Sequence, residues 1–212
     1  MWDSLAEPWQ ICIAEAWIAY CRGSLPIGAA VTDREGRVLA RGRNRIFEQD
    51  AEGRLLCGNR LAHAEVNALI SLDWSTVDPR SSVLYTTTEP CAFCVGAVRQ
   101  TRLGEVHYAS RDSAAGSITL FEATPWMHRG QVRVVGPTLP HLEVVLIAML
   151  AEFGFAQDDE NTTSWCERLA EAVPRGVALG ADLHQSGELQ AWRREERDCA
   201  WVIDELAVRV GK

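Results

Sequence analysis

Two segments rich in hydrophobic residues, one near the start of the chain and one after residue 140, predict buried helices. The stretch 8–22, PWQICIAEAWIAYCR, predicts a largely buried helix with Pro8 in its first turn, where a proline is tolerated. From Leu142 onward, apolar residues follow at positions 145, 146, 149, 150 and 153, which is the spacing of one helix face. Both segments are therefore expected to form helices that pack into the core.

Shorter runs of β-branched and apolar residues predict strands between these two helices. The runs 26–32 and 37–43 are separated by the turn sequence DREG at 33–36, so they predict a hairpin. Helices are expected to begin near Ala62 and at Cys91. Three more strands are expected at 82–88, 104–109 and 131–136.

Strands alternate with helices after the opening hairpin. This order predicts an α/β domain of three layers, α/β/α, whose later strands are joined by helical crossovers. The polar sequence QDDENTTS interrupts the apolar pattern after residue 156. We therefore divide the chain into a domain at 1–156 and a helical C-terminal extension at 157–212.

Two helical segments are predicted in the extension. The sequence SWCE at 164–167 fits a capping box that opens a short helix ending at Pro174. From Leu189, apolar residues with 3–4 spacing predict an amphipathic helix of about twenty residues, broken by Glu196. We expect its apolar face to dock on the chain's own domain or on a partner subunit. The extension is expected to be structural, because it offers no metal-binding or proton-transfer grouping.

The composition is that of a globular protein, with 47% hydrophobic and 24% charged residues among 212. No run of about 18 apolar residues suggests a membrane span, and the sequence MWDSLAEPWQ at the start lacks the features of a secretory signal. We therefore expect a cytoplasmic protein. The net charge is −8, and the densest basic cluster contains only Arg41, Arg43 and Arg45. Because phosphate neutralisation supplies most of the affinity for nucleic acids, a small-molecule substrate is favoured over a polynucleotide.

The chain has seven cysteines, an odd number, and most of them lie far apart. A disulfide framework is therefore not expected. Four cysteines lie in apolar helical contexts, where cysteine usually behaves as a small buried hydrophobe: Cys12, Cys21, Cys166 and Cys199. Only Cys91 and Cys94 have the spacing of metal ligands.

Two segments carry residues suited to metal chemistry, HAE at 63–65 and PCAFC at 90–94. An imidazole and two thiolates are ligands that Zn²⁺ prefers, and three protein ligands leave the fourth position for water. His63, Cys91 and Cys94 are expected at two helix starts, where the positive end of the helix dipole favours thiolates. We therefore predict one zinc ion per chain.

Glu65 lies two residues from His63, in the first turn of the same predicted helix. A carboxylate there can take a proton from a zinc-bound water without being a ligand. A purely structural zinc site would need a fourth ligand, for which Cys57 is the nearby candidate. The pattern H-x-E followed by P-C-x-x-C is the signature of zinc deaminases. These residues therefore favour a catalytic zinc.

With these segments, the sequence resembles the cytidine deaminase-like superfamily, in its branch of tRNA adenosine deaminases and guanine deaminases. The matching segments lie within residues 8–155 and are PIGAAVTDREGRVLARGRNR, AHAEVNAL, LYTTTEPCAFCVGAV and RLGEVHYASRDSAAGS. The resemblance implies a five-stranded mixed sheet between layers of helices, one zinc ion per chain and a homodimer.

The same resemblance implies roles for single residues. It makes Glu65 the proton shuttle, and it gives three zinc ligands: His63, Cys91 and Cys94. Three further positions match substrate contacts: Asn44 through its side chain, Ala64 through its backbone N–H, and Pro90, whose region lines the side of the leaving amine.

Trp126 lies in the segment ATPWMHRG, between the fourth and fifth predicted strands. A loop there could close over a flat ring, and an aromatic side chain could stack on it, although core packing explains a tryptophan equally well. We therefore include Trp126 among the candidate substrate contacts.

These features predict a zinc-dependent hydrolase that converts a C–NH₂ group on a nitrogen heterocycle to C=O and releases ammonia. A purine-like base such as guanine, as the free base or a nucleoside, is the favoured substrate. Two alternatives remain open: an adenosine deaminase acting on tRNA, and a catalytically inactive, zinc-stabilised interaction module.

Overall fold

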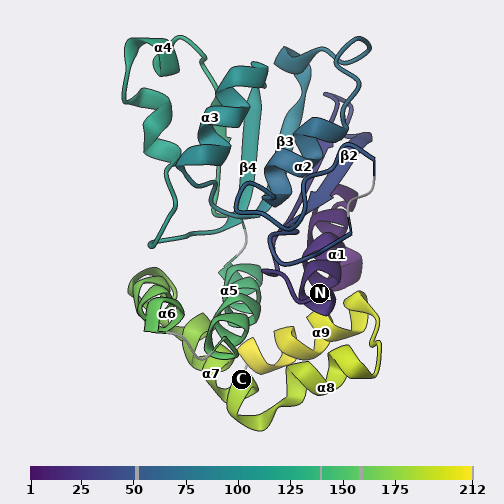
Figure 1. Ribbon diagram of the computed structural model, residues 1–212, viewed down its shortest axis with the longest axis vertical. Helices are drawn as coiled ribbons and strands as arrows, with labels where there is room; N and C mark the ends of the chain where they lie inside the picture. The colour runs from purple at the N-terminus through teal and green to yellow at the C-terminus, as the bar shows by residue number, and fades with distance from the viewer. Residues whose placement is uncertain (51–52, 139, 158–159, 212) are drawn as a thin grey trace.

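A five-stranded mixed sheet forms the centre of the molecule, as the resemblance implies (Figure 1). The computed structural model describes residues 1–50, 53–138, 140–157 and 160–211. The strands lie in the order β2-β1-β3-β4-β5. β1 pairs antiparallel with β2 and β3, whereas β3, β4 and β5 run parallel. Their bounds are Gly28–Thr32 for β1, Val38–Arg43 for β2, Val83–Thr88 for β3, Glu105–Ser110 for β4 and Arg133–Val135 for β5.

Helices cover both faces of the sheet, which confirms the predicted α/β/α layers. On one face, α1 (Glu7–Cys21) and α5 (Pro140–Phe155) share a hydrophobic cluster. On the other face, α2 (Ala64–Ser71) and α3 (Ala92–Thr101) share a second cluster with the sheet. All four helices lie where the sequence predicts them, within two residues at their starts.

Glycine at position 42 allows α2 to approach the sheet at backbone distance. A Cβ atom at Gly42 would lie 2.4 Å from the carbonyl oxygen of Ala64, so no larger residue fits there without a shift of the backbone. Gly28 has the same role on the other face, where a Cβ atom would lie 2.0 Å from the carbonyl oxygen of Cys12 in α1. The start of α2 is therefore pressed directly against β2.

The crossover from β3 through α3 to β4 places the start of α3 at the carboxyl end of β3. The strand ends at Thr88, and Pro90, which has no N–H to donate, follows two residues later.

Four short elements were not predicted from the sequence: the 3₁₀ turns Trp2–Ser4, Pro79–Ser81 and Ile118–Glu122, and the helical turn α4 (Pro125–His128).

The C-terminal extension contains four helices in the described residues, where the sequence predicted two. They are α6 (Glu160–Ala172), α7 (Pro174–Ser186), α8 (Glu188–Arg194) and α9 (Cys199–Val210). The capping box at 164–167 is wrong, because α6 begins before it and the Ser164 hydroxyl accepts a hydrogen bond from Arg168 inside the helix. The single long helix from Leu189 is also wrong. The chain turns at Glu196, whose φ is +53°, and separates α8 from α9.

Helix α7 was not predicted from the sequence, because glycines occupy the face that packs on α5. Gly176 and Gly180 are buried, and a Cβ atom at Gly180 would lie 2.7 Å from the carbonyl oxygen of Ala148 in α5. Glycine disfavours an isolated helix by about 1 kcal/mol relative to alanine, so local propensity does not mark this segment. Close contact between the two backbones stabilises it instead.

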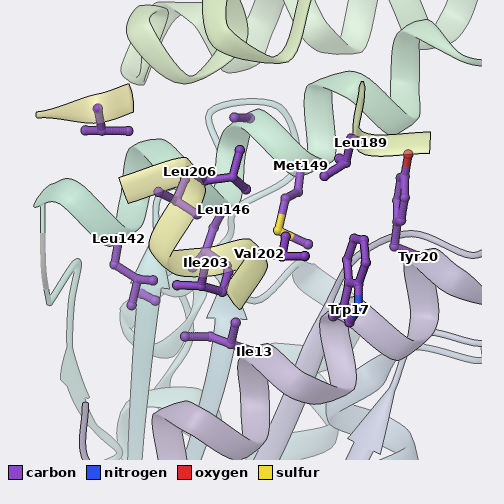
Figure 2. Close-up of a cluster of buried hydrophobic side chains, with 14 of the residues drawn as sticks. Ile13, Trp17, Tyr20, Leu142, Leu146, Met149, Leu189, Val202, Ile203 and Leu206 are labelled. Atoms are coloured by element: carbon purple, nitrogen blue, oxygen red, sulfur yellow. The ribbon is translucent and has the colours of Figure 1, made fainter. Parts of the chain in front are cut away.

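The extension packs on the chain's own first 156 residues, as one of the two docking predictions states. Figure 2 shows Val202, Ile203 and Leu206 of α9 against Leu146 of α5 and Ile13 of α1. The indole N–H of Trp17 in α1 donates a 3.0 Å hydrogen bond to the carbonyl oxygen of Arg197, just before α9. The hydrophobic cluster therefore includes residues on both sides of position 156, and the division into 1–156 and 157–212 stays a prediction.

None of the helices in the described part of the chain combines the length and the apolar character that a bilayer crossing requires.

A pair of substitutions in α9 tests how much this docking contributes to stability. Leu206 is fully buried, whereas Val208 on the same helix is 55% exposed. We expect Leu206→Ala to lower the free energy of unfolding by about 2–5 kcal/mol, because neighbouring side chains relax only partly into the cavity that it leaves. Val208→Ala should change it by less than about 0.5 kcal/mol. Urea denaturation monitored by circular dichroism measures both, and equal effects would show that α9 is not held by its apolar face.

Candidate active site

Two helix starts bring the three predicted zinc ligands together. His63 is the N-cap residue of α2, Cys91 is the N-cap residue of α3, and Cys94 lies in the first turn of α3. The Nδ1 atom of His63 lies 3.6 Å from Sγ of Cys91 and 3.4 Å from Sγ of Cys94, and the two sulfur atoms are 3.7 Å apart. Within the described ranges, no other group of three such side chains converges in this way.

These distances fit a tetrahedral zinc ion. With Zn–S bonds of about 2.3 Å, two sulfur ligands at tetrahedral angles lie about 3.8 Å apart, close to the observed separation. Cys57, the candidate for a fourth ligand, does not belong to the cluster. The three side chains therefore fit a site whose fourth position is left for water or substrate, which is the arrangement of catalytic zinc.

The two thiols of the cluster differ in acidity. A hydrogen bond with Cys94 and, after it, the nearby His63 imidazole lower the pKa of Cys91 to about 4, against the opposing effect of burial. The bond with Cys91 and burial raise the pKa of Cys94. Interaction with Cys91 also raises the pKa of His63. Thiolate is the form that binds metal, so the lowered pKa of Cys91 favours its role as a ligand.

Glu65 lies beside the ligands without belonging to their cluster. Its side chain is 4% exposed, and burial raises the pKa of the carboxyl group. The hydroxyl of Thr86, in β3, donates a 3.3 Å hydrogen bond to its Oε1 atom. A carboxyl group fixed beside the metal position, with one oxygen held by the sheet, is placed for proton transfer.

A cavity of about 140 Å³ opens on this cluster. His63, Glu65 and Cys91 line one part of it, together with the predicted substrate contact Asn44. The other lining residues are Leu25, Ile27, Ile46, Thr88, Glu89, Asp112, Ala115 and Trp165. Drug-sized ligands occupy pockets of about 300–1,000 Å³, so this cavity suits a single small ring system.

Asn44 presents a hydrogen-bond donor to the cavity. Its Oδ1 atom accepts hydrogen bonds from the Ser24 hydroxyl at 2.7 Å and from the backbone N–H of Ile46 at 3.1 Å. These two bonds fix the orientation of the amide, and its Nδ2 group donates to no atom of the described residues. The side chain is therefore set to donate to an acceptor atom of a ligand.

Ala64 and Pro90 lie next to the cavity without lining it. Ala64 is the first residue of α2, where a backbone N–H has no partner within the helix. Pro90 is buried, and its carbonyl oxygen accepts a hydrogen bond from the N–H of Ser117. Its neighbours Glu89 and Cys91 line the cavity instead.

Trp126 is not brought to the site. It lies in α4, 44% exposed, with the Arg99 guanidinium 4.0 Å from the centre of its ring. Because β5 runs parallel to β4, the connection between them must return to the amino ends of the strands before β5 begins. Figure 1 shows α4 at that end of the sheet, whereas the metal ligands follow the carboxyl end of β3. Trp126 therefore does not line the cavity, and the predicted substrate contact by this residue is wrong.

Among the lining residues that the sequence analysis did not single out, two carboxylates had a signal in the sequence and Trp165 did not. Glu89 directly precedes Pro90-Cys91, and Asp112 follows the carboxyl end of β4, the same edge of the sheet. Burial raises the pKa of both carboxyl groups. Oδ1 of Asp112 accepts hydrogen bonds from the N–H groups of Ala114 and Ala115, both at 2.9 Å. Trp165 had no signal, because it comes from the extension.

Comparison with known proteins gives one family and several relatives. A family model described as "Cytidine and deoxycytidylate deaminase zinc-binding region" matches residues 4–110, which include His63, Glu65, Cys91 and Cys94. The tRNA-specific adenosine deaminase of Rickettsia bellii is 28% identical over 132 residues, which cover 57% of this chain and 82% of that protein.

Two solved structures share the fold. A guanine deaminase from Nitrosomonas europaea matches with a TM-score of 0.50 and 24% identity, over 70% of this chain and 85% of that one. A protein named NE0047, in complex with 2,6-diaminopurine, matches with a TM-score of 0.51 and 26% identity, over 70% of this chain and 82% of the other.

Proposed function

The chain belongs to the cytidine and deoxycytidylate deaminase family, and we propose that it hydrolyses the amino group of a free, purine-like base such as guanine, releasing ammonia. One observation carries the proposal. Two of the three clustered zinc donors, His63 and Cys91, line the same small cavity as the buried carboxyl group of Glu65. A ring carbon placed there would face both the metal position and a proton carrier.

The reaction adds water to a ring carbon and expels its amine. Zinc, when bound by one imidazole and two thiolates, supplies a Lewis acid that activates water. Glu65 takes a proton from this water and gives it to the ring nitrogen beside the reacting carbon. It would then take the remaining proton of the added hydroxyl group and give it to the departing amine, so that C–NH₂ and water become C=O and ammonia. The hydrogen bond from Thr86 holds the carboxyl group in place during these transfers.

The remaining polar residues of the cavity favour an uncharged ring with N–H donors. Glu89 and Asp112 bring carboxyl groups that accept hydrogen bonds, and Asn44 brings a donor. None of the described lining residues is a lysine or an arginine, so nothing in the lining pairs with a phosphate. This supports a free base or nucleoside over a nucleotide. The similarity to NE0047 also supports it, since that protein was solved with an aminated purine base.

A second candidate is deamination of adenosine in tRNA. The sequence relatives described as tRNA-specific adenosine deaminases favour it. The net charge of −8 and the acidic cavity lining favour the free base. A catalytically inactive interaction module is the weakest alternative, because the cavity keeps both a proton carrier and an open ligand position.

An ammonia-release screen on the zinc-loaded full chain tests the proposal. The panel contains guanine, 2,6-diaminopurine, adenine and cytosine, the matching nucleosides and monophosphates, and an adenosine-containing tRNA. We expect the highest kcat/KM for a purine base and at least tenfold less for its monophosphate. Deamination confined to the tRNA, weakening with added salt, would establish the second candidate instead.

We further propose a homodimer in the cytoplasm. Unpaired cysteines are typical of reducing compartments, and the structure pairs none of the cysteines in the described residues. Leu61, two residues before His63, and Phe93, between Cys91 and Cys94, are 54% and 41% exposed. Exposed apolar side chains next to the ligand positions suit contact with a second subunit.

A further inference from the structure

Helix α6 of the extension reaches the proposed substrate cavity. In Figure 1 it lies below the sheet, beyond the carboxyl ends of β3 and β4. The Ser113 hydroxyl donates a hydrogen bond to the carbonyl oxygen of Arg168, which ties α6 to the loop that follows β4. That loop supplies Asp112 and Ala115 to the cavity, and α6 supplies Trp165. The extension is thus part of the wall around the substrate position.

The indole of Trp165 is held from behind by the core. A Cβ atom at Gly154, in α5, would lie 3.2 Å from Cζ3 of Trp165, so the ring rests on the bare backbone of α5. The ring also packs against a small hydrophobic cluster built by α5, α6 and α7, which includes Leu150 and Leu169. Its orientation is therefore set by contacts away from the cavity, as for a surface that meets a rigid ligand.

Trp165 gives the cavity its aromatic face. Apart from the ligand His63, it is the aromatic residue among the described lining residues, beside the aliphatic Leu25, Ile27 and Ile46. Flat heterocycles bind well against an aromatic ring, because stacking adds to the burial of apolar area. Polar lining residues such as Asn44, Glu89 and Asp112 can form hydrogen bonds with atoms at the edge of such a ring. The faces of the ring need apolar partners.

We propose that Trp165 is a substrate-binding residue, which packs its indole against the face of the base and makes the C-terminal extension a part of the active site. This inference rests on the proposed function, since it assumes that a flat base occupies the cavity. It assigns to the extension a role in binding that its sequence does not show.

Binding of 2,6-diaminopurine, measured by calorimetry, tests the assignment. The zinc-loaded Glu65→Gln protein is the background, so that turnover does not disturb the titration. Trp165→Leu removes the aromatic face but keeps an apolar side chain. We expect it to raise the Kd by about tenfold. Trp165→Phe keeps a ring and should stay within about threefold. Trp74→Leu is the matched control, because Trp74 is exposed and outside the cavity lining, and it should leave the Kd unchanged.

Three results separate the possible failures. If Trp165→Leu binds as well as the parent, or if Trp165→Phe loses as much as Trp165→Leu, stacking by Trp165 is refuted while the proposed function stands. If the parent binds the base but the wild-type chain releases no ammonia from any base, the proposed function fails, and the Kd comparison still decides the role of Trp165. If neither the parent nor the wild-type chain binds 2,6-diaminopurine, the assignment of Trp165 is overturned, and ammonia release by the wild-type chain decides the proposed function separately. Zinc content and thermal unfolding of each variant show that the fold is retained.

Discussion

Replacing Glu65 by glutamine is expected to lower kcat for ammonia release by about a thousandfold, since general acid–base groups contribute about 10²–10⁴-fold. Glutamine keeps the size of the side chain and can still accept the hydrogen bond from Thr86. It cannot take a proton from water or deliver one to the ring and the amine. Because Glu65 is not one of the clustered ligands, zinc should remain at one ion per chain.

The control is a second buried glutamate that lies outside the cavity lining. Glu152 is fully buried, accepts a 2.6 Å hydrogen bond from the Tyr20 hydroxyl and does not line the cavity. Glu152→Gln should keep kcat within about twofold, even if it lowers the melting temperature. Initial rates at saturating base and metal analysis give both quantities. Activity of Glu65→Gln at a tenth of wild type or more would exclude it as the proton carrier.

Local sequence was sufficient to predict the zinc cluster. Each ligand lies at a strand-to-helix or loop-to-helix junction, and the residues that build these junctions are neighbours in the chain. Pro90 follows the end of β3, Cys91 caps α3, and the i, i+3 spacing puts Cys94 on the same helix face. The five strands were predictable for the same reason, because alternation and turn residues are local features.

Long-range packing explains what the sequence did not show. Glycines that face α5 make α7 a poor helix by propensity, yet backbone contact stabilises it. Trp126 was included among the candidate substrate contacts but does not line the cavity, because the parallel pairing of β4 and β5 decides where their connection lies. Trp165 meets the cavity only because α6 folds back past the loop after β4. None of these relations is encoded within one short segment.

The second large effect is expected on zinc binding, when one ligand of the cluster is removed. Cys91→Ala should reduce bound zinc from about one ion per chain to near zero after dialysis against a weak chelator. Only His63 and Cys94 would remain, and two ligands cannot enclose the ion in the way that catalytic sites with three protein ligands do. The loss should leave the fold intact, because Cys91 caps α3 through its backbone and the hydrophobic clusters on both faces of the sheet lie elsewhere.

Cys57→Ala supplies the comparison, because Cys57 is half-buried like Cys91 but lies outside the ligand cluster. It should keep about one zinc ion per chain and full ammonia release. Elemental analysis of both variants, with circular dichroism to verify folding, distinguishes the two kinds of site. Equal loss of zinc in Cys57→Ala would mean that a fourth thiolate closes the coordination sphere. In that case water would have no place on the metal, and neither Glu65 nor Trp165 could act on a substrate there.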